Sequence, residues 1–163
     1  MRGRLTTPWG DYLLVGDEPA ELLDADSGKR LWKGDAESAV LGITSDRVIT
    51  TRFNDDSFKP GTTTATDLTS GEESWRLATG PNDTLPGNTE NYAVSETRFA
   101  FGYDDVSDTD EPRRLLVFNA TDGKELWRTT HSGVLGLGDD WLIGVKWTDI
   151  VPADPAVIEF YDA

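Results

Sequence analysis

The sequence predicts an all-β fold assembled from small four-stranded sheets that stack face to face. Three observations support this prediction. A short turn pattern ending in tryptophan recurs along the chain, each copy follows a polar turn and a β-rich run, and amphipathic patterns of helical length are missing. Short strands at regular spacing, separated by turn residues, are typical of all-β architectures.

The recurring pattern is clearest in "LLDADSGKRLW" (Leu22 to Trp32), "ATDLTSGEESW" (Ala65 to Trp75) and "VFNATDGKELW" (Val117 to Trp127). The final residues, "IEFYDA", match its beginning and then stop. The repeat consists of a turn-opening Asp or Asn, a Gly and a Trp: Asp24, Gly28 and Trp32; Asp67, Gly71 and Trp75; Asn119, Gly123 and Trp127; and Asp162 alone in the last copy. The turn-opening residues are 43, 52 and 43 residues apart.

Each residue type in the repeat has a physical reason to recur. An Asp or Asn at the end of a strand accepts hydrogen bonds from N–H groups two or three residues further on and so closes a turn. Gly suits a position that needs a positive φ. Trp buries roughly 200 Å² and can anchor one sheet on the next. Since a single thin sheet cannot bury both of its faces, the repeat predicts a propeller or another stack of sheets.

The predicted strands fall into four groups along the chain. The first group lies near 3–7, 11–16, 20–25 and 29–33, and the second near 38–43, 47–53, 62–67 and 72–77. The third lies near 90–94, 97–103, 114–119 and 124–129, and the fourth near 133–137, 140–147 and 155–162. The fourth group therefore lacks a last strand and its tryptophan.

The first and third copies resemble the repeat consensus of PQQ-like (quinoprotein-type) β-propellers, an aliphatic-Leu-Asp-x-x-Thr-Gly-Lys-x-x-Trp unit. The second copy has Ser70 and Glu72 where that unit has Thr and Lys, and the third has Asn119 and Asp122 for its Asp and Thr. The family includes outer-membrane-assembly lipoproteins, receptor-kinase sensor domains and quinoprotein dehydrogenases. The resemblance implies blades of four antiparallel strands in a ring of seven or eight.

On this basis residues 1–163 form a single partial propeller domain with blades near 1–34, 35–79, 80–131 and 132–163, the last one incomplete. One interpretation is a piece of a longer propeller. Another is a half that pairs with a second copy of itself, as a homodimer that completes the ring. Both predict an interface, because an open stack leaves unpaired edges and an uncovered apolar face. A closed ring of four blades is disfavoured, since the N-terminal segment already supplies a first strand.

The charge balance excludes some classes of partner. The chain has 163 residues and a formal net charge of −15. Such a chain repels phosphate backbones and anionic lipids, so we expect neither nucleic-acid binding nor direct membrane insertion. No apolar run approaches the ~20 residues of a spanning helix. The first residues lack the apolar core of a signal peptide.

Few residues suggest catalysis. There is no Cys, which excludes thiolate chemistry, and His131 is the only histidine. A Ser-His-Asp triad would need His131, but no G-x-S-x-G elbow is present and the adjacent Ser132 has poor triad geometry. We therefore predict no catalytic residue. Three further tryptophans, Trp9, Trp141 and Trp147, lie outside the repeat position, and we expect them to be buried within or between blades.

One acidic stretch is a candidate metal site. "DDVSDTDE" spans Asp104 to Glu111 and joins two strands of the third blade. Calcium takes several oxygen ligands, so Asp104, Asp105, Asp108 and Asp110 are candidate ligands. The alternative interpretation is a solvated loop, because the EF-hand pattern is absent. No other cofactor is expected. The dehydrogenases of the family hold quinone with residues that this chain does not match, and they carry a vicinal disulfide.

The functional prediction is a non-enzymatic scaffold or binding module for a protein or peptide partner. Long loops on a rigid framework often carry binding, and "NDDSFKPG" and "TGPNDTLPGNTEN" are the longest other candidates. One alternative is an extracytoplasmic ligand-sensing domain of a receptor or kinase. The other is a fragment of a quinone-dependent oxidoreductase. The resemblance favours a location outside the cytoplasm, in the cell envelope or secreted.

Overall fold

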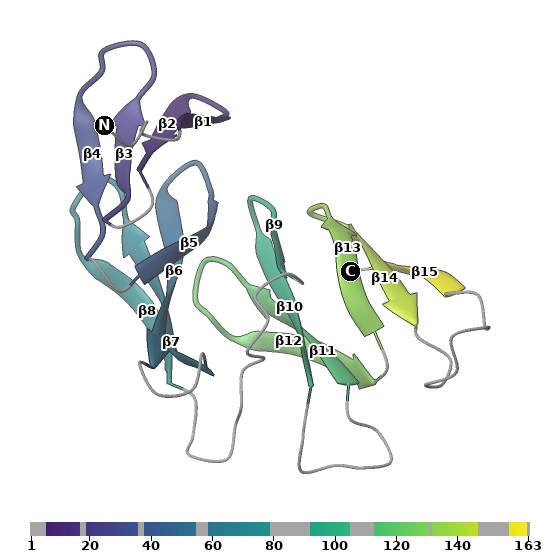
Figure 1. Cartoon of the computed structure of the whole chain (residues 1–163). Coiled ribbons are helices and arrows are strands. Elements are labelled where there is room, and N and C mark those ends of the chain that lie inside the picture. The colour runs from purple at the N-terminus through teal and green to yellow at the C-terminus, as the bar shows by residue number, and fades with distance from the viewer. Residues whose placement is uncertain are drawn as a thin grey trace.

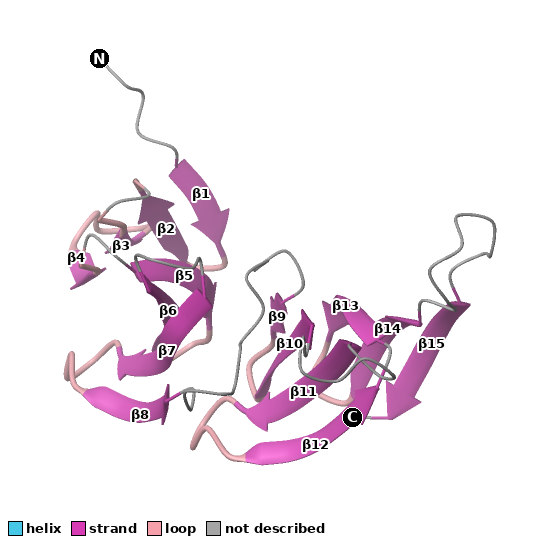
Figure 2. Ribbon diagram, turned by 60° about the horizontal axis from the view of Figure 1, so that its bottom comes forward, coloured by secondary structure: helices cyan, strands magenta, loops and turns pink. Residues whose placement is uncertain are grey.

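In a computed structural model of the chain, the structure describes residues 6–16, 19–35, 38–54, 59–78, 92–104, 113–130, 132–146 and 157–162. These residues contain strands, turns and bends and no helix. The all-β prediction is therefore confirmed for the described part of the chain. The strands form four separate sheets, arranged in chain order along an arc (Figures 1 and 2).

Each sheet is a simple antiparallel meander of consecutive strands. Sheet 1 contains β1 (Thr6–Trp9), β2 (Tyr12–Val15), β3 (Glu21–Asp24) and β4 (Arg30–Lys33). Sheet 2 contains β5 (Ser38–Ile43), β6 (Arg47–Asn54), β7 (Lys59–Asp67) and β8 (Glu73–Ala78). Sheet 3 contains β9 (Tyr92–Val94), β10 (Arg98–Asp104), β11 (Arg113–Asn119) and β12 (Glu125–Thr130). Sheet 4 contains β13 (Ser132–Leu137), β14 (Trp141–Lys146) and β15 (Val157–Asp162).

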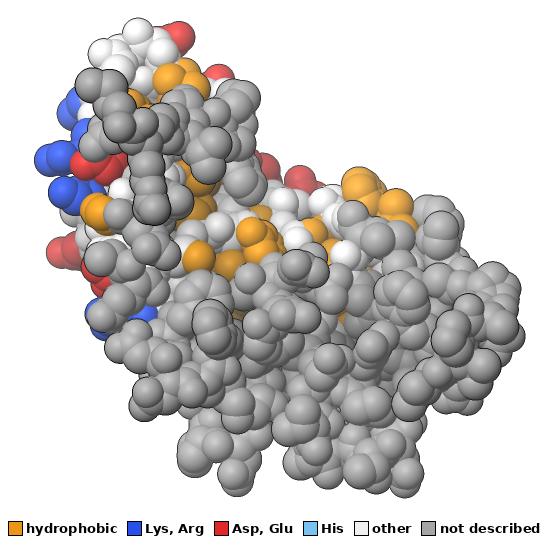
Figure 3. Space-filling model, viewed as in Figure 1, with side chains coloured by type: hydrophobic (Ala, Val, Ile, Leu, Met, Phe, Trp, Pro, Cys, Tyr) orange, Lys and Arg blue, Asp and Glu red, His pale blue; other side chains and the backbone are white. Residues whose placement is uncertain are grey.

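The prediction of four-stranded sheets with an incomplete last one is confirmed. Sheets 1 to 3 have four strands each, and sheet 4 has three among the described residues. The first strands lie on the inner side of the arc and the fourth strands on its outer side (Figure 2). Along the inner side β5 neighbours β9, and β9 neighbours β13. Hydrophobic side chains line the hollow that the arc encloses (Figure 3).

The core is divided into three layers, one between each pair of neighbouring sheets. Alternate residues of a strand point to opposite faces, so one strand contributes to two layers. In β10, Phe99 packs toward sheet 2 while the adjacent Ala100 packs toward sheet 4. In β6, Val48 packs toward sheet 1 while Ile49 packs toward sheet 3. The two inner sheets, sheets 2 and 3, are therefore packed on both faces.

Two kinds of β-bulge recur at equivalent places. In each complete sheet the pairing of the last two strands shifts immediately before the repeat Trp, which leaves Leu31, Ser74 and Leu126 as the extra residues. In sheets 2 and 4 the pairing of the first two strands shifts just before Gly42 and Gly136. A bulge bends its strand and re-aims the side chains that follow it. The bulge before each Trp therefore helps to set the direction in which the indole points.

Candidate functional site

The repeat turns have the same geometry in all three complete sheets. In sheet 1, the Asp24 N–H donates to the Lys29 carbonyl and the Gly28 N–H donates to the Asp24 carbonyl, both at 2.9 Å. The same two bonds recur at 2.9 Å around Asp67 and around Asn119. The turn glycines have φ values of 67° (Gly28), 74° (Gly71) and 70° (Gly123), which favour glycine.

The acidic turn side chains are engaged within their own turns. Asp24 Oδ1 accepts a 2.7 Å hydrogen bond from the Ser27 N–H and one from the Ser27 hydroxyl. Asp67 Oδ1 accepts from the N–H groups of Thr69 and Ser70 and from the Ser70 hydroxyl. These hydrogen bonds lower the pKa of Asp24, chiefly through the Ser27 hydroxyl, and the pKa of Asp67, chiefly through the Ser70 N–H. These carboxylates therefore stabilise the turns in which they lie.

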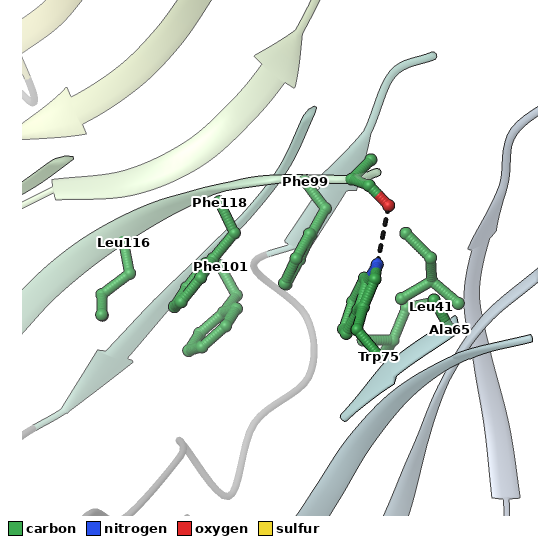
Figure 4. Packing of buried hydrophobic residues seen from close by; sticks show 9 residues of the cluster. Leu41, Ala65, Trp75, Phe99, Phe101, Leu116 and Phe118 are labelled. Atoms are coloured by element: carbon green, nitrogen blue, oxygen red, sulfur yellow. Dashed lines mark hydrogen bonds between the residues drawn. The ribbon is translucent and has the colours of Figure 1, made fainter. Parts of the chain in front are cut away.

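The repeat tryptophan of sheet 2 joins that sheet to the next one. Trp75 is 8% exposed, and its indole Nε1 donates a 2.8 Å hydrogen bond to the Ala120 carbonyl in the repeat turn of sheet 3 (Figure 4). The indole stacks on Phe99 with ring centroids 5.2 Å apart, and Phe99 stacks on Phe118 at 4.9 Å. This cluster combines apolar burial with the pairing of a buried polar N–H.

The other two repeat tryptophans occupy equivalent layers. Trp32 packs beside Leu22 and Val48 between sheets 1 and 2. Trp127 packs beside Val117 and Leu142 between sheets 3 and 4. Both are half-buried, whereas Trp75 is buried against the aromatic side chains of sheet 3. Each indole thus faces the following sheet.

Asp162 takes the corresponding position in sheet 4. It is the last residue of β15 and pairs with Trp141, as Asp24 pairs with Tyr12 and Asn119 pairs with Arg98. The register therefore extends the repeat into the fourth sheet, although the side chain of Asp162 lies outside the described part of the structure.

A chain of polar contacts links the turns between the first and second strands of neighbouring sheets. The Tyr12 hydroxyl of sheet 1 donates to the Ser45 carbonyl of sheet 2 at 2.7 Å. The Ser45 N–H donates to Glu96 Oε2 of sheet 3 at 2.8 Å. The N–H and hydroxyl of Thr97 in sheet 3 donate to Asp139 Oδ1 of sheet 4 at 3.1 and 3.0 Å. These contacts connect all four sheets at one end of the stack.

This polar chain is not predictable from the sequence. Its only signal is a polar or acidic residue in each of these turns, and such residues are also common in isolated turns. Two side chains of this polar chain have shifted pKa values. Hydrogen bonds from Ser95 and Thr97 lower the pKa of Asp139. Burial, followed by the nearby carboxylates of Asp11, Glu96 and others, raises the pKa of Tyr12.

The second and third strands of sheets 2 to 4 are connected at the opposite end from these turns. The register pairs Asn54 with Lys59, Asp104 with Arg113, and Lys146 with Val157, so the second and third strands of sheets 2 to 4 are connected at that end. At the same end of the stack the third strand pairs with the last residues of the fourth strand, as Thr62 pairs with Ala78. The two ends therefore differ: hydrogen-bonded turns form one, and the long connections leave from the other.

Most of the predicted metal site lies outside the described residues. Asp104 ends β10 at the connection end, whereas Asp105, Asp108 and Asp110 are not described. The calcium site therefore stays a prediction. His131 and the loop 79–91 also lie outside the described residues. Within the described ranges no group of three or more His, Cys, Asp or Glu side chains could hold a metal ion.

One expectation about the remaining tryptophans is wrong. Trp141 is not buried within or between blades but is 46% exposed. Its indole lies over Gly136 of the neighbouring strand and over Gly138, which follows that strand, and a Cβ added to Gly136 would be 3.4 Å from the ring. No described sheet covers this face of sheet 4, which explains the exposure. The side chains of Trp9 and Trp147 lie outside the described part of the structure.

The described residues contain no helix that is long and apolar enough to cross a membrane. In a comparison with known protein families, the family model described as "Outer membrane protein assembly factor BamB" aligns with residues 2–133. No curated protein matches the chain.

Several solved structures share the fold. BamB from Moraxella catarrhalis is 20% identical with a TM-score of 0.50, and the match covers 83% of this chain and 40% of that one. The computationally designed Ika8 protein is 16% identical with a TM-score of 0.52, covering 85% of this chain and 41% of that one. A europium-containing methanol dehydrogenase is 16% identical with a TM-score of 0.50, covering 81% of this chain and 25% of that one. The chain thus spans less than half the length of these structures.

Proposed function

Since the chain belongs to the family of outer membrane protein assembly factor BamB, we propose that it is a non-enzymatic propeller scaffold that binds a protein or peptide partner. The predicted resemblance to PQQ-like propeller repeats is confirmed by the family match and by the shared fold of the solved structures. Fold alone does not define a function, so the proposal rests on how the stack presents its surfaces.

The observation that carries the proposal is the difference between the two ends of the stack. At the turn end, carboxylates such as Asp67, Glu96 and Asp139 are committed to hydrogen bonds within or between sheets. The connection end receives the long segments that leave β8, β10 and β14, whereas β6 and β7 are joined there by a short one. A framework that is fixed at one end and carries long connections at the other is suited to recognition by loops.

The rigidity of the framework supports the same conclusion. Buried layers separate neighbouring sheets, and the polar contacts of the turn end connect all four. A preorganised surface loses less conformational entropy when a partner binds. The formal net charge of −15 favours partners with basic segments, because opposite charge steers association.

We also propose that binding requires no quinone and no metal ion. The repeat carboxylates of Asp24 and Asp67 serve turn hydrogen bonds rather than a shared site. The solved methanol dehydrogenase is 16% identical, so its likeness to this chain concerns the fold alone. The test is equilibrium dialysis against pyrroloquinoline quinone with calcium chloride, for which we expect no retained quinone. Stoichiometric retention would favour the oxidoreductase alternative.

Site-specific photo-crosslinking in cells of the source organism tests the binding surface. A photoreactive residue at position 113 reports on the connection end, since Arg113 begins β11 opposite Asp104. The matched control is position 124, because Lys124 is exposed in the repeat turn of the same sheet. We expect a discrete protein adduct from position 113 and a much weaker one from position 124. Adducts from position 124 alone, equal adducts from both positions, or none at either would contradict the proposal.

The description of the family places its function at the outer membrane. We therefore propose that this chain works outside the cytoplasm, in the cell envelope. A second copy of the chain is one protein partner that we propose, because no described sheet covers the outer faces of sheets 1 and 4.

A further inference from the structure

Every sheet in the stack has two different faces. We call the face toward the following sheet the leading face and the face toward the preceding sheet the trailing face. The leading face of sheet 2 carries Ile49 and Trp75, and the trailing face of sheet 3 carries Phe99 and Phe118. The same two kinds of face meet between sheets 1 and 2 and between sheets 3 and 4. The stack therefore makes one type of interface three times.

The trailing face of sheet 1 has no described sheet against it. Leu14 and Leu22 belong to the layer between sheets 1 and 2, so the alternating Leu13 and Leu23 point the other way. Leu13 pairs with Leu23 across two strands, as Phe99 pairs with Phe118 in sheet 3. Both leucines are half-buried, whereas Phe99 is 1% exposed.

The leading face of sheet 4 is uncovered in the same way. Leu142 is buried against sheet 3, so Trp141 and Ile143 on either side of it point outward. Ile143 corresponds in register to Ile49 and Ala100, each of which is covered by a following sheet. Trp141 is 46% exposed.

The residue of sheet 1 that corresponds in register to Trp141 contacts the following sheet. Trp141 pairs with Asp162 as Tyr12 pairs with Asp24. Tyr12 reaches the following sheet and donates to the Ser45 carbonyl. The equivalent side chain in sheet 4 is a larger aromatic, and no described sheet follows for it to reach.

We propose that the leading face of sheet 4 binds the trailing face of sheet 1 of a second copy of this chain. The contact repeats part of the interface that the stack already makes internally, with Leu13 and Leu23 placed as Phe99 and Phe118 are. It lacks a repeat tryptophan, because the described part of sheet 4 has three strands. Such a contact is heterologous, because two different patches meet. The sheets follow an arc (Figures 1 and 2), and the proposed dimer is a ring in which two copies make two identical contacts. This inference rests on the proposed protein-binding function and extends it by identifying one partner.

The net charge of the chain predicts that dimerisation depends on salt concentration. Each copy carries a formal net charge of −15, so two copies repel each other while their apolar faces attract. Salt screens the repulsion, since the Debye length falls from about 10 Å at 0.1 M to about 3 Å at 1 M ionic strength. The dimer should therefore form more tightly at high salt.

Sedimentation equilibrium of the 163-residue chain tests the proposal with three variants. Trp141→Glu blocks the leading face of sheet 4, and Leu13→Glu blocks the trailing face of sheet 1. Leu126→Glu is the matched control, because Leu126 is also 46% exposed but lies at the bulge of β12, away from both end faces. We expect the wild type and the control to dimerise, and each blocking variant to weaken dimerisation about tenfold or more. Circular dichroism confirms that each variant is folded.

Mixing the two blocking variants tests whether the contact joins two different faces, as a heterologous contact requires. In a mixed dimer one contact contains both blocked faces and the other contains none, so the mixture should recover dimers that neither variant forms alone. A monomeric wild type at all salt concentrations, equal weakening by Leu126→Glu, or a mixture that stays monomeric would overturn the proposal. Photo-crosslinking at position 113 tests the binding function separately, so the two failures are distinguishable.

Discussion

The indole Nε1 of Trp75 donates a 2.8 Å hydrogen bond to the carbonyl oxygen of Ala120, which lies 45 residues further along the chain in the next sheet. The bond joins the last strand of one sheet to the repeat turn of its neighbour. The neighbouring turn thus provides both the acceptor and, through Gly123, the space that the ring occupies. Two copies of the repeat are therefore complementary to each other.

Gly123 should be less replaceable than the equivalent Gly71. Both have positive φ, so replacement by Ala costs about 1 kcal/mol at either site. A Cβ at Gly123 would also meet the Trp75 ring at 2.8 Å, whereas a Cβ at Gly71 meets nothing within 4 Å. We expect Gly123→Ala to lower the free energy of unfolding, measured with urea, by about 1–3 kcal/mol more than Gly71→Ala does. Equal losses would show that the turn does not support the indole.

Gly42 should couple energetically to Val94. A Cβ on Gly42 would come within 2.4 Å of Val94 Cγ2 in the first strand of sheet 3. Gly42→Ala should therefore destabilise the chain by about 1–3 kcal/mol through overpacking. Val94→Gly removes the Cβ and both methyl groups that a Cβ on Gly42 would meet, so the double variant should be more stable than the sum of the single losses implies. Strict additivity in the same denaturation assay would contradict the close approach of these strands.

The repeat turns should make stability depend on acid pH. The turn hydrogen bonds lower the pKa of Asp67 below its ordinary value of 3.8. Stabilisation by the ionised carboxylate is therefore present above pH of about 4 and is lost as the pH falls through the folded-state pKa. Asp67→Asn removes the titration while keeping an acceptor, as Asn119 does naturally in the third copy.

We expect the Asp67→Asn variant to show a flatter fall in unfolding free energy below about pH 4 than the wild type does. The control is Asp26→Asn, which changes an exposed aspartate in the turn of sheet 1. An unchanged pH profile for Asp67→Asn, or an equal change in the control, would refute this role of the turn carboxylate.

The acidic stretch that begins at Asp104 makes a prediction about metal binding. A solvated loop predicts that EDTA and calcium chloride leave the melting temperature unchanged, and we expect this result. The alternative calcium site predicts a rise in melting temperature with calcium, by mass action on the folded state. Thermal unfolding of the wild type and of a variant with Asn at Asp104, Asp105, Asp108 and Asp110 distinguishes the two. A calcium-dependent rise that this variant abolishes would establish the site.

The sequence is sufficient to predict the sheets because its local signals agree with one another. The Asp-to-Gly turns fix where strands reverse, and the apolar runs fix which segments are buried. Other features depend on contacts between distant segments. The bulge that exposes Leu126 and directs Trp127 involves no unusual residue type, so composition and periodicity contain no signal for it.

The polar contacts at the turn end escape prediction for a related reason. Glu96 and Ser45 are 51 residues apart, and each is an ordinary turn residue by itself. The pairing appears only once the sheets are placed side by side. The exposure of Trp141 also escapes prediction, because burial of a large aromatic is the usual expectation and depends here on whether a further sheet covers it. The predicted metal ligands remain untested, since most lie outside the described residues.

The central claim is that the repeat tryptophan holds neighbouring sheets together, and a double-mutant cycle between Trp75 and Phe99 tests it most directly. Trp75→Leu, Phe99→Leu and the double variant are compared by urea unfolding. Stacking across the layer, with ring centroids 5.2 Å apart, predicts a coupling energy of about 0.5–1.5 kcal/mol. If the loss of unfolding free energy in the double variant equals the sum of the two single losses to within about 0.3 kcal/mol, the two rings stabilise their own sheets independently. That result would contradict the claim.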